Sequence, residues 1–155
     1  MSSDECRRGL EEAKRTLEAA GFPVMVEDET LTSFFAIDKE GAAFAYTVEC
    51  SEDGRPEAYA GVRGLVERLK GLDCSARERF WLKLLELPSR YRVSVGLDKD
   101  LLLIYFPPGD PATVYTYVGS TYALGASIAG WIMDALEALG KGGEIPEFRP
   151  EEAEG

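Results

Sequence analysis

Residues 31–50, LTSFFAIDKEGAAFAYTVEC, contain two apolar runs on either side of a polar turn. Runs rich in β-branched and aromatic residues that flank a turn are typical of a β-hairpin. We therefore expect strands at Leu31–Ile37 and Ala42–Cys50, joined by the turn Asp38–Gly41. Successive side chains of a strand point to opposite faces, so Phe34 falls on the side opposite its two neighbours. Both faces of the hairpin are then apolar, which predicts two coverings, one of them a partner.

A helix is expected on each side of this hairpin. The first begins at a capping box formed by Ser2 and Glu5 and ends at Gly21–Pro23, after which Val24 and Val26 alternate as a short strand. After a polar loop, apolar residues recur at helical spacing and predict a second helix: Tyr59, Val62, Val66 and Leu69.

The second half of the chain shows a similar alternation. A second capping box, Ser75 with Glu78, predicts a helix that ends at Pro88. Strands are then predicted at Tyr91–Leu97, Leu101–Phe106 and Ala112–Val118. Ser120 or Thr121 is expected to cap a last helix that ends at Gly140.

The expected element order is α-βββ-α-α-βββ-α. It predicts an α+β fold in which an antiparallel meander sheet is flanked by helices. We expect residues 1–141 to form one domain and residues 142–155, with five Glu and one Arg, to form an acidic and flexible tail. A shift of 70 residues places Leu31 on Leu101 and Val48 on Val118, so an internal αβββα duplication and a chance agreement of apolar periods both remain open.

The composition excludes several kinds of chemistry. The chain has 155 residues, a formal net charge of -11 and no His, and it also lacks Asn and Gln. Without His there is no Ser-His-Asp relay and no His-ligated zinc. The acidic balance disfavours nucleic acid and anionic membranes, because like charges repel. Abundant Glu and Arg resemble thermophile composition, with a halophile as the competing interpretation.

The cysteines and the termini indicate a cytoplasmic protein. Three cysteines (Cys6, Cys50 and Cys74) are an odd number without C-x-x-C spacing, which argues against a disulfide framework or a thiolate zinc site. Free thiols suit a reducing compartment. The charged N-terminus is unlike a signal peptide, and the most apolar segment, Val118–Met133, is too short and too mixed to span a bilayer.

No catalytic residue, metal site or cofactor is predicted. Cys74 precedes a helix but has no His to act as its base. Adjacent carboxylates occur only at predicted turns, such as Asp98 and Asp100, where acidic residues are favoured by turn chemistry. An alternative function is the binding of a small ligand or anion at Gly119, Ser120 and Thr121, where a strand is expected to meet a helix N-terminus. Three tyrosines lie nearby in the sequence: Tyr115, Tyr117 and Tyr122.

The last helix carries a face of small residues: Gly125, Ala126, Ala129 and Gly130. Glycine in the middle of a helix costs about 1 kcal/mol relative to Ala, so these residues indicate a close approach. The approaching surface is either the protein's own sheet or a partner. A basic stretch at Arg77–Arg92 is either a solvated surface or a place for an acidic peptide, including the protein's own tail.

The chain also resembles a known family. Its opening amphipathic helix ends in Ala-Ala-Gly-Phe-Pro-Val at 19–24, and strands, a helix, further strands and a closing helix near Ile128–Leu139 follow. This order, over residues 5–139, resembles the type III secretion chaperone-like superfamily, including its YbjN-like domains. The resemblance implies an antiparallel sheet flanked by helices, frequent homodimers and binding of partner-protein segments without catalysis.

The function expected from the sequence is therefore that of a protein-interaction or chaperone-like module, with a homodimer as the expected assembly. The residues expected to bind the partner lie on the hairpin and on the small face of the last helix: Phe34, Phe44, Tyr46, Gly125, Ala126, Ala129 and Gly130.

Overall fold

A single antiparallel sheet forms the centre of the molecule. The computed structural model describes the backbone of residues 2–150 and the side chains of residues 4–150. Six strands are hydrogen-bonded in the order β1-β2-β3-β4-β6-β5. Their bounds are β1 Val24–Glu27, β2 Thr30–Ala36, β3 Ala43–Cys50, β4 Pro56–Arg63, β5 Ser94–Asp98 and β6 Leu101–Tyr105. The prediction of an α+β fold with an antiparallel sheet and flanking helices is confirmed.

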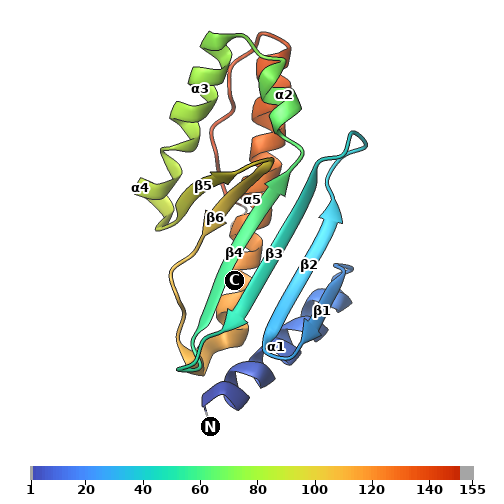
Figure 1. Ribbon diagram of the computed structural model, residues 1–155, viewed down its shortest axis with the longest axis vertical. Coiled ribbons are helices and arrows are strands. Elements are labelled where there is room, and N and C mark those ends of the chain that lie inside the picture. Colours follow the sequence, from blue (N-terminus) through green and yellow to red (C-terminus); the bar gives the residue numbers. More distant parts are fainter. Residues whose placement is uncertain (1, 151–155) are drawn as a thin grey trace.

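The helices gather on one side of this sheet. Figure 1 shows α1 and α5 behind the sheet, whereas the face turned toward the viewer carries no helix. The bounds of the helices are α1 Ser2–Ala19, α2 Val66–Lys70, α3 Cys74–Leu84, α4 Leu87–Tyr91 and α5 Val114–Gly140, with a short 3-10 turn at Pro111–Thr113. We call the side that faces α1 and α5 the inner face and the opposite side the outer face.

The core lies between α5 and the inner face. Phe44, Val62 and Ile104 come from three neighbouring strands and are fully or almost fully buried, as are Ile128 and Ile132 of α5. Gly125 permits the close contact of α5 with the sheet, because a Cβ atom there would lie 3.2 Å from the Cβ of Ala60. The small residue at position 125 therefore serves packing within the chain.

Two predicted elements were wrong. Tyr59 and Val62, which were predicted to begin the second helix, lie in β4, because Ala58, Ala60 and Val62 alternate into the core at strand spacing. The predicted strand Ala112–Val118 instead covers the 3-10 turn and the first turn of α5, where Val114 and Val118 are buried one helical turn apart. The strands are consequently divided into four and two along the chain.

These corrections bear on the proposed duplication. A shift of 70 residues places Val48 of β3 on Val118 of α5, and Val62 of β4 on Ile132 of α5. Strands are thus aligned with a helix, and the structure does not confirm an internal repeat.

The predicted caps differ from the observed ones. Asp73, rather than Ser75, caps α3, because its carboxylate accepts a hydrogen bond of 2.8 Å from the backbone N–H of Ala76. Ser2 begins α1, but its side chain lies outside the described residues.

Two cysteines are joined, contrary to the prediction of free thiols. Cys6 of α1 and Cys50 at the end of β3 form a disulfide across a sequence separation of 44 residues. Their side chains meet because α1 packs against the inner face, where both cysteines are buried. Cys74 is the third cysteine; it is free and exposed. The argument for a reducing compartment depended on free thiols and no longer applies to this pair.

The segment after α5 contacts the body of the protein at Pro146 and Phe148. Phe148 is buried, with its ring centroid 5.2 Å from that of Tyr91 and 6.0 Å from that of Trp131. The indole N–H of Trp131 donates a hydrogen bond of 2.7 Å to the carbonyl of Pro146. These contacts at Pro146 and Phe148 hold that part of the segment against the body, and the flexibility predicted for the tail from residue 142 stays a prediction; residues 151–155 lie outside the described residues.

Candidate functional site

The outer face of the sheet is not covered by the helices (Figure 1). The strand register assigns every second side chain to it, and the ladder places those side chains in rows across the strands. Two central rows are mainly apolar: Met25, Thr32, Thr47, Tyr59 and Tyr105 in one, and Phe34, Ala45, Gly61, Leu103 and Gly96 in the other.

Large apolar side chains on this face are open to solvent. Met25 is 61% exposed, Phe34 is 56% exposed and Tyr105 is 45% exposed. In a monomer, large apolar side chains clustered on one face usually mark a binding surface, whereas single exposed ones are ordinary. The expectation that one apolar face of the hairpin lacks a covering within the chain agrees with this exposure (Figure 1).

Of the three hairpin residues predicted to bind a partner, only Phe34 lies on the outer face. Phe44 and Tyr46 are 0% and 1% exposed and point toward α5. The phenolic oxygen of Tyr46 lies 2.7 Å from Oγ1 of Thr121, within hydrogen-bonding distance. Phe44 and Tyr46 are core residues, and their predicted role in binding is wrong. The error follows from strand parity, because Phe44 is opposite Phe35 and not opposite Phe34.

The middle of the outer face is lined by small side chains. On β3 these are Ala43, Ala45 and Thr47, which we call the β3 strip. Phe34 flanks the strip on β2. On β4, Gly61 has no side chain, and the side chain of Leu101 lies over it, since a Cβ at Gly61 would fall 2.8 Å from Cδ1 of Leu101. A row of small side chains therefore runs along β3, between the larger apolar side chains of Phe34 and Leu101.

One end of the outer face is acidic. The register aligns Glu27, Thr30, Glu49 and Glu57 across β1 to β4, and we call its three glutamates the acidic row. Glu49 and Glu57 are direct cross-strand neighbours. Within the described residues none of the three glutamates forms an ion pair. Like charges placed opposite each other destabilise a sheet, so the acidic row is a cost that the fold itself does not offset.

The sequence reasoning missed the residues of β6 on this face. Leu101, Leu103 and Tyr105 point outward, whereas Leu102 and Ile104 enter the core. The unbroken apolar run at 101–106 was a usable signal, because a strand that is apolar on both faces needs two coverings.

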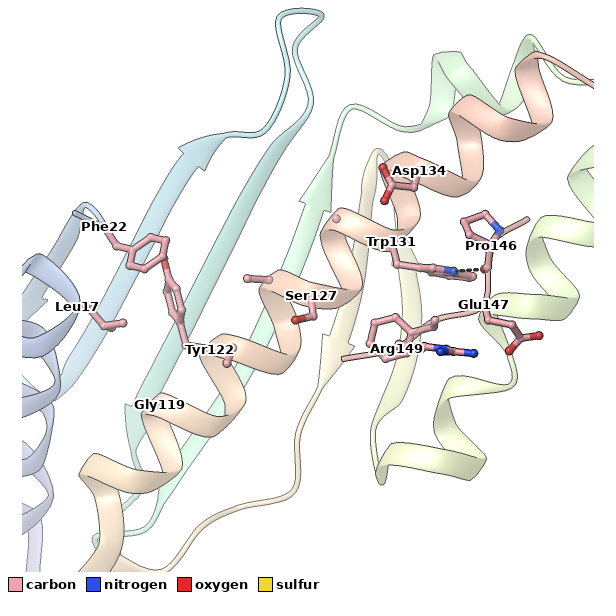
Figure 2. A pocket seen from close by; sticks show the side chains of 14 residues that line it. Leu17, Phe22, Gly119, Tyr122, Ser127, Trp131, Asp134, Pro146, Glu147 and Arg149 are labelled. Atoms are coloured by element: carbon pink, nitrogen blue, oxygen red, sulfur yellow. Dashed lines mark hydrogen bonds between the residues drawn. The ribbon is translucent and has the colours of Figure 1, made fainter. Parts of the chain in front are cut away.

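The small residues of α5 are divided between two environments. Gly125 and Ala129 are buried against the protein's own sheet, so their predicted role in binding a partner is wrong. Ala126 and Gly130 line a groove of about 750 Å³ on the solvent side of α5. Figure 2 shows this groove, with Leu17, Phe22 and Tyr122 at one end and Trp131, Pro146 and Glu147 at the other.

The predicted anion site lacks the feature on which it depended. Gly119, Ser120 and Thr121 lie inside α5, which begins at Val114, and only the first four N–H groups of a helix are free. The hydroxyl of Thr121 is already engaged, because it donates to the carbonyl of Tyr117 at 2.9 Å. The proposed backbone cradle for an anion is therefore absent from these three residues.

Two of the three tyrosines of this region, Tyr117 and Tyr122, form hydrogen bonds within the fold. The hydroxyl of Tyr117 donates to the carbonyl of Pro107 at 2.8 Å, and the hydroxyl of Tyr122 lies 2.9 Å from Oγ of Ser33. Burial raises the pKa of the Tyr46, Tyr117 and Tyr122 hydroxyls above that of a free tyrosine, so they stay protonated. Tyr115 is exposed, and its hydroxyl oxygen lies 3.1 Å from Oγ1 of Thr16.

The basic stretch contacts the protein's own C-terminal segment, which was one of the two alternatives for it. Lys83 donates a hydrogen bond of 3.2 Å to Glu147, and Arg90 lies 3.9 Å from the same carboxylate. The hydrogen bond from Lys83 lowers the pKa of Glu147 below its usual range. All three side chains are substantially exposed, so this contact orients the segment more than it stabilises the fold.

No comparison with known proteins assigns a family to the chain. No family model matches the sequence, and neither a curated protein nor a solved structure matches it. Among the described residues, no three His, Cys, Asp or Glu side chains are grouped to hold a metal ion. None of the described helices combines the length and the apolar character needed to cross a bilayer.

Proposed function

We propose that the protein is a non-enzymatic protein-interaction module whose outer sheet face holds a partner protein. The observation that carries this proposal is the exposure of Phe34, Met25 and Tyr105 on a sheet whose other face is filled by α1 and α5. Aromatic residues and Met are enriched at protein interfaces, where they bury large apolar areas. The resemblance to the type III secretion chaperone-like superfamily implies the same kind of function.

The outer face suits a protein better than a small ligand. Small-molecule sites are concave and combine apolar walls with a few convergent polar groups. The two central rows instead extend across six strands, with Ser94 of β5 at the end of the first row, and five strands, and they carry only Thr, Tyr and Ser as polar side chains. A surface about 25 Å wide at the usual strand spacing matches the footprint of a protein element.

A displayed library of random peptides, selected on the immobilised full chain, tests this function. We expect selected peptides to bind Phe34→Asp at least about tenfold more weakly than the wild type, because the substitution places a charge within an apolar contact. Binding is measured by fluorescence anisotropy, and circular dichroism verifies that the variant is folded, as the exposure of Phe34 predicts.

The matched control is Leu82→Asp. Leu82 is 61% exposed, similar to Phe34, but it lies on α3, away from the sheet. Peptides that bind Leu82→Asp as they bind the wild type support the proposal. Selected peptides that bind Phe34→Asp with the same affinity as the wild type would overturn the proposal. A selection that yields no binder would also overturn it.

A further inference from the structure

We infer that the segment held on the outer face is an amphipathic α-helix with basic side chains at the end that meets the acidic row. Its apolar side lies along the β3 strip, and its cations lie over the acidic row. This inference rests on the proposed function, because it names the occupant of the same surface.

The dimensions of the surface favour a helix. The backbones of β2 and β4 are two strand spacings apart, about 10 Å. An α-helix with its side chains is about 10–12 Å across, so one helix fits over β3 between Phe34 on one side and Leu101 on the other. The small side chains of Ala45 and Thr47 are partly exposed and leave room for the larger apolar side chains of such a helix, whereas Ala43 at the end of the strip is buried.

The charges favour a basic partner. The outer face carries four carboxylates, from the acidic row and Asp98, and one cation, Arg63. The acidic row forms no ion pair within the described residues, and Glu49 faces Glu57 directly. Lysines or arginines of a partner would relieve this repulsion, and they would also be drawn toward a chain of net charge -11.

A second copy of the chain fits less well. In a face-to-face dimer with its two-fold axis along the strands, the two acidic rows would lie against each other. With the axis across the strands, the acidic row of each copy would meet the row at the other end of its partner's outer face. That row contains one cation, Arg63, and one carboxylate, Asp98. Either arrangement leaves most of the glutamates unpaired, and the homodimer predicted from the sequence is therefore not the occupant that the charges favour.

Three synthetic peptides of about 18 residues, long enough to cover β3 as a helix, provide the test. The first places Leu and Ala on one side of a helix and Lys in the turns at one end. The second replaces each Lys with Glu, and the third keeps the composition of the first but distributes its apolar residues around the helix. Fluorescence anisotropy with the full chain measures each dissociation constant.

We expect the first peptide to bind at least about tenfold more tightly than the other two. The Phe34→Asp variant loses about tenfold in affinity for it, and Glu49→Gln/Glu57→Gln loses about tenfold together with part of the salt dependence. Glu12→Gln/Glu144→Gln removes the same charge from exposed positions away from the outer face, and we expect affinity within about twofold of the wild type.

Three outcomes would overturn the inference. Equal binding of the Lys and Glu peptides would exclude the role of the acidic row. Equal losses in the two glutamate double variants would show a general charge effect only. A wild-type chain that sediments as a dimer, and that Phe34→Asp converts to a monomer, would identify a second copy as the occupant. If the chain forms such a dimer, the proposed function stands without this inference. The same holds if the library peptides require Phe34 for binding and the Lys peptide does not bind.

Discussion

Replacing Gly125 with Leu is expected to lower the free energy of unfolding by about 3 kcal/mol. A Cβ atom at position 125 would already lie 3.2 Å from Ala60, 3.5 Å from Phe44 and 3.6 Å from Phe106. The additional carbons of Leu have no space unless α5 moves away from β3 and β4, and such a movement opens the core. Urea unfolding followed by circular dichroism measures the change.

Gly119 and Gly130 supply the matched controls. Both lie in α5, and a Cβ atom at either position would meet nothing within 4 Å. Replacing each with Ala is expected to stabilise the helix by up to about 1 kcal/mol, because Ala has a higher helix propensity than Gly. If Gly125→Leu unfolded at the same urea concentration as the wild type, the described contact of α5 with the sheet would be wrong.

Removing the disulfide is expected to cost about 2–4 kcal/mol. The bond between Cys6 and Cys50 closes a loop across a separation of 44 residues and so restricts the unfolded chain. The double variant Cys6→Ala/Cys50→Ala should unfold at a lower urea concentration than the oxidised wild type. Adding reductant to the wild type should lower its midpoint urea concentration by a similar amount.

Reductant should leave this double variant unchanged, and Cys74→Ala should behave like the wild type because Cys74 is exposed and free. Thiol titration under denaturing, non-reducing conditions gives an independent result. One reactive thiol per chain is expected, and three would show that Cys6 and Cys50 are not joined.

The hairpins were predictable because local signals and long-range packing agree there. The turn at Asp38–Gly41 and the apolar runs on either side of it give β2 and β3, and Asp98–Asp100 gives the tight connection between β5 and β6 in the same way. Glycine or acidic residues between strand-like runs favour turns irrespective of the rest of the chain.

β4 was not predictable in this way. Its positions that face the core hold only Pro56, Ala58, Ala60 and Val62, so the alternation is weak beside the helical spacing of larger residues nearby. Its place between β3 and β6 is fixed by tertiary pairing, which overrides local propensity. The disulfide likewise depends on the packing of α1 against the inner face. The number and spacing of the cysteines in the sequence do not reveal this packing.

The outer face was predictable only in part. Phe34 was placed correctly because the alternation within one hairpin determines which side it faces. The contributions of Met25, Leu103 and Tyr105 depend on which strands lie beside this hairpin, and the acidic row arises only when β1 to β4 are aligned in register. Binding surfaces that span several strands follow from topology more than from any single motif.

The outer face is tested most directly by methyl NMR of the full chain, with and without a peptide selected on it. We expect shifts at the methyl groups of Met25, Ala45 and Leu103, which lie on the outer face. The methyl groups of Leu82 on α3 and Ala126 in the α5 groove should stay unchanged. Shifts confined to Leu82 or Ala126, with the outer-face methyl groups unaffected, would contradict binding at this surface.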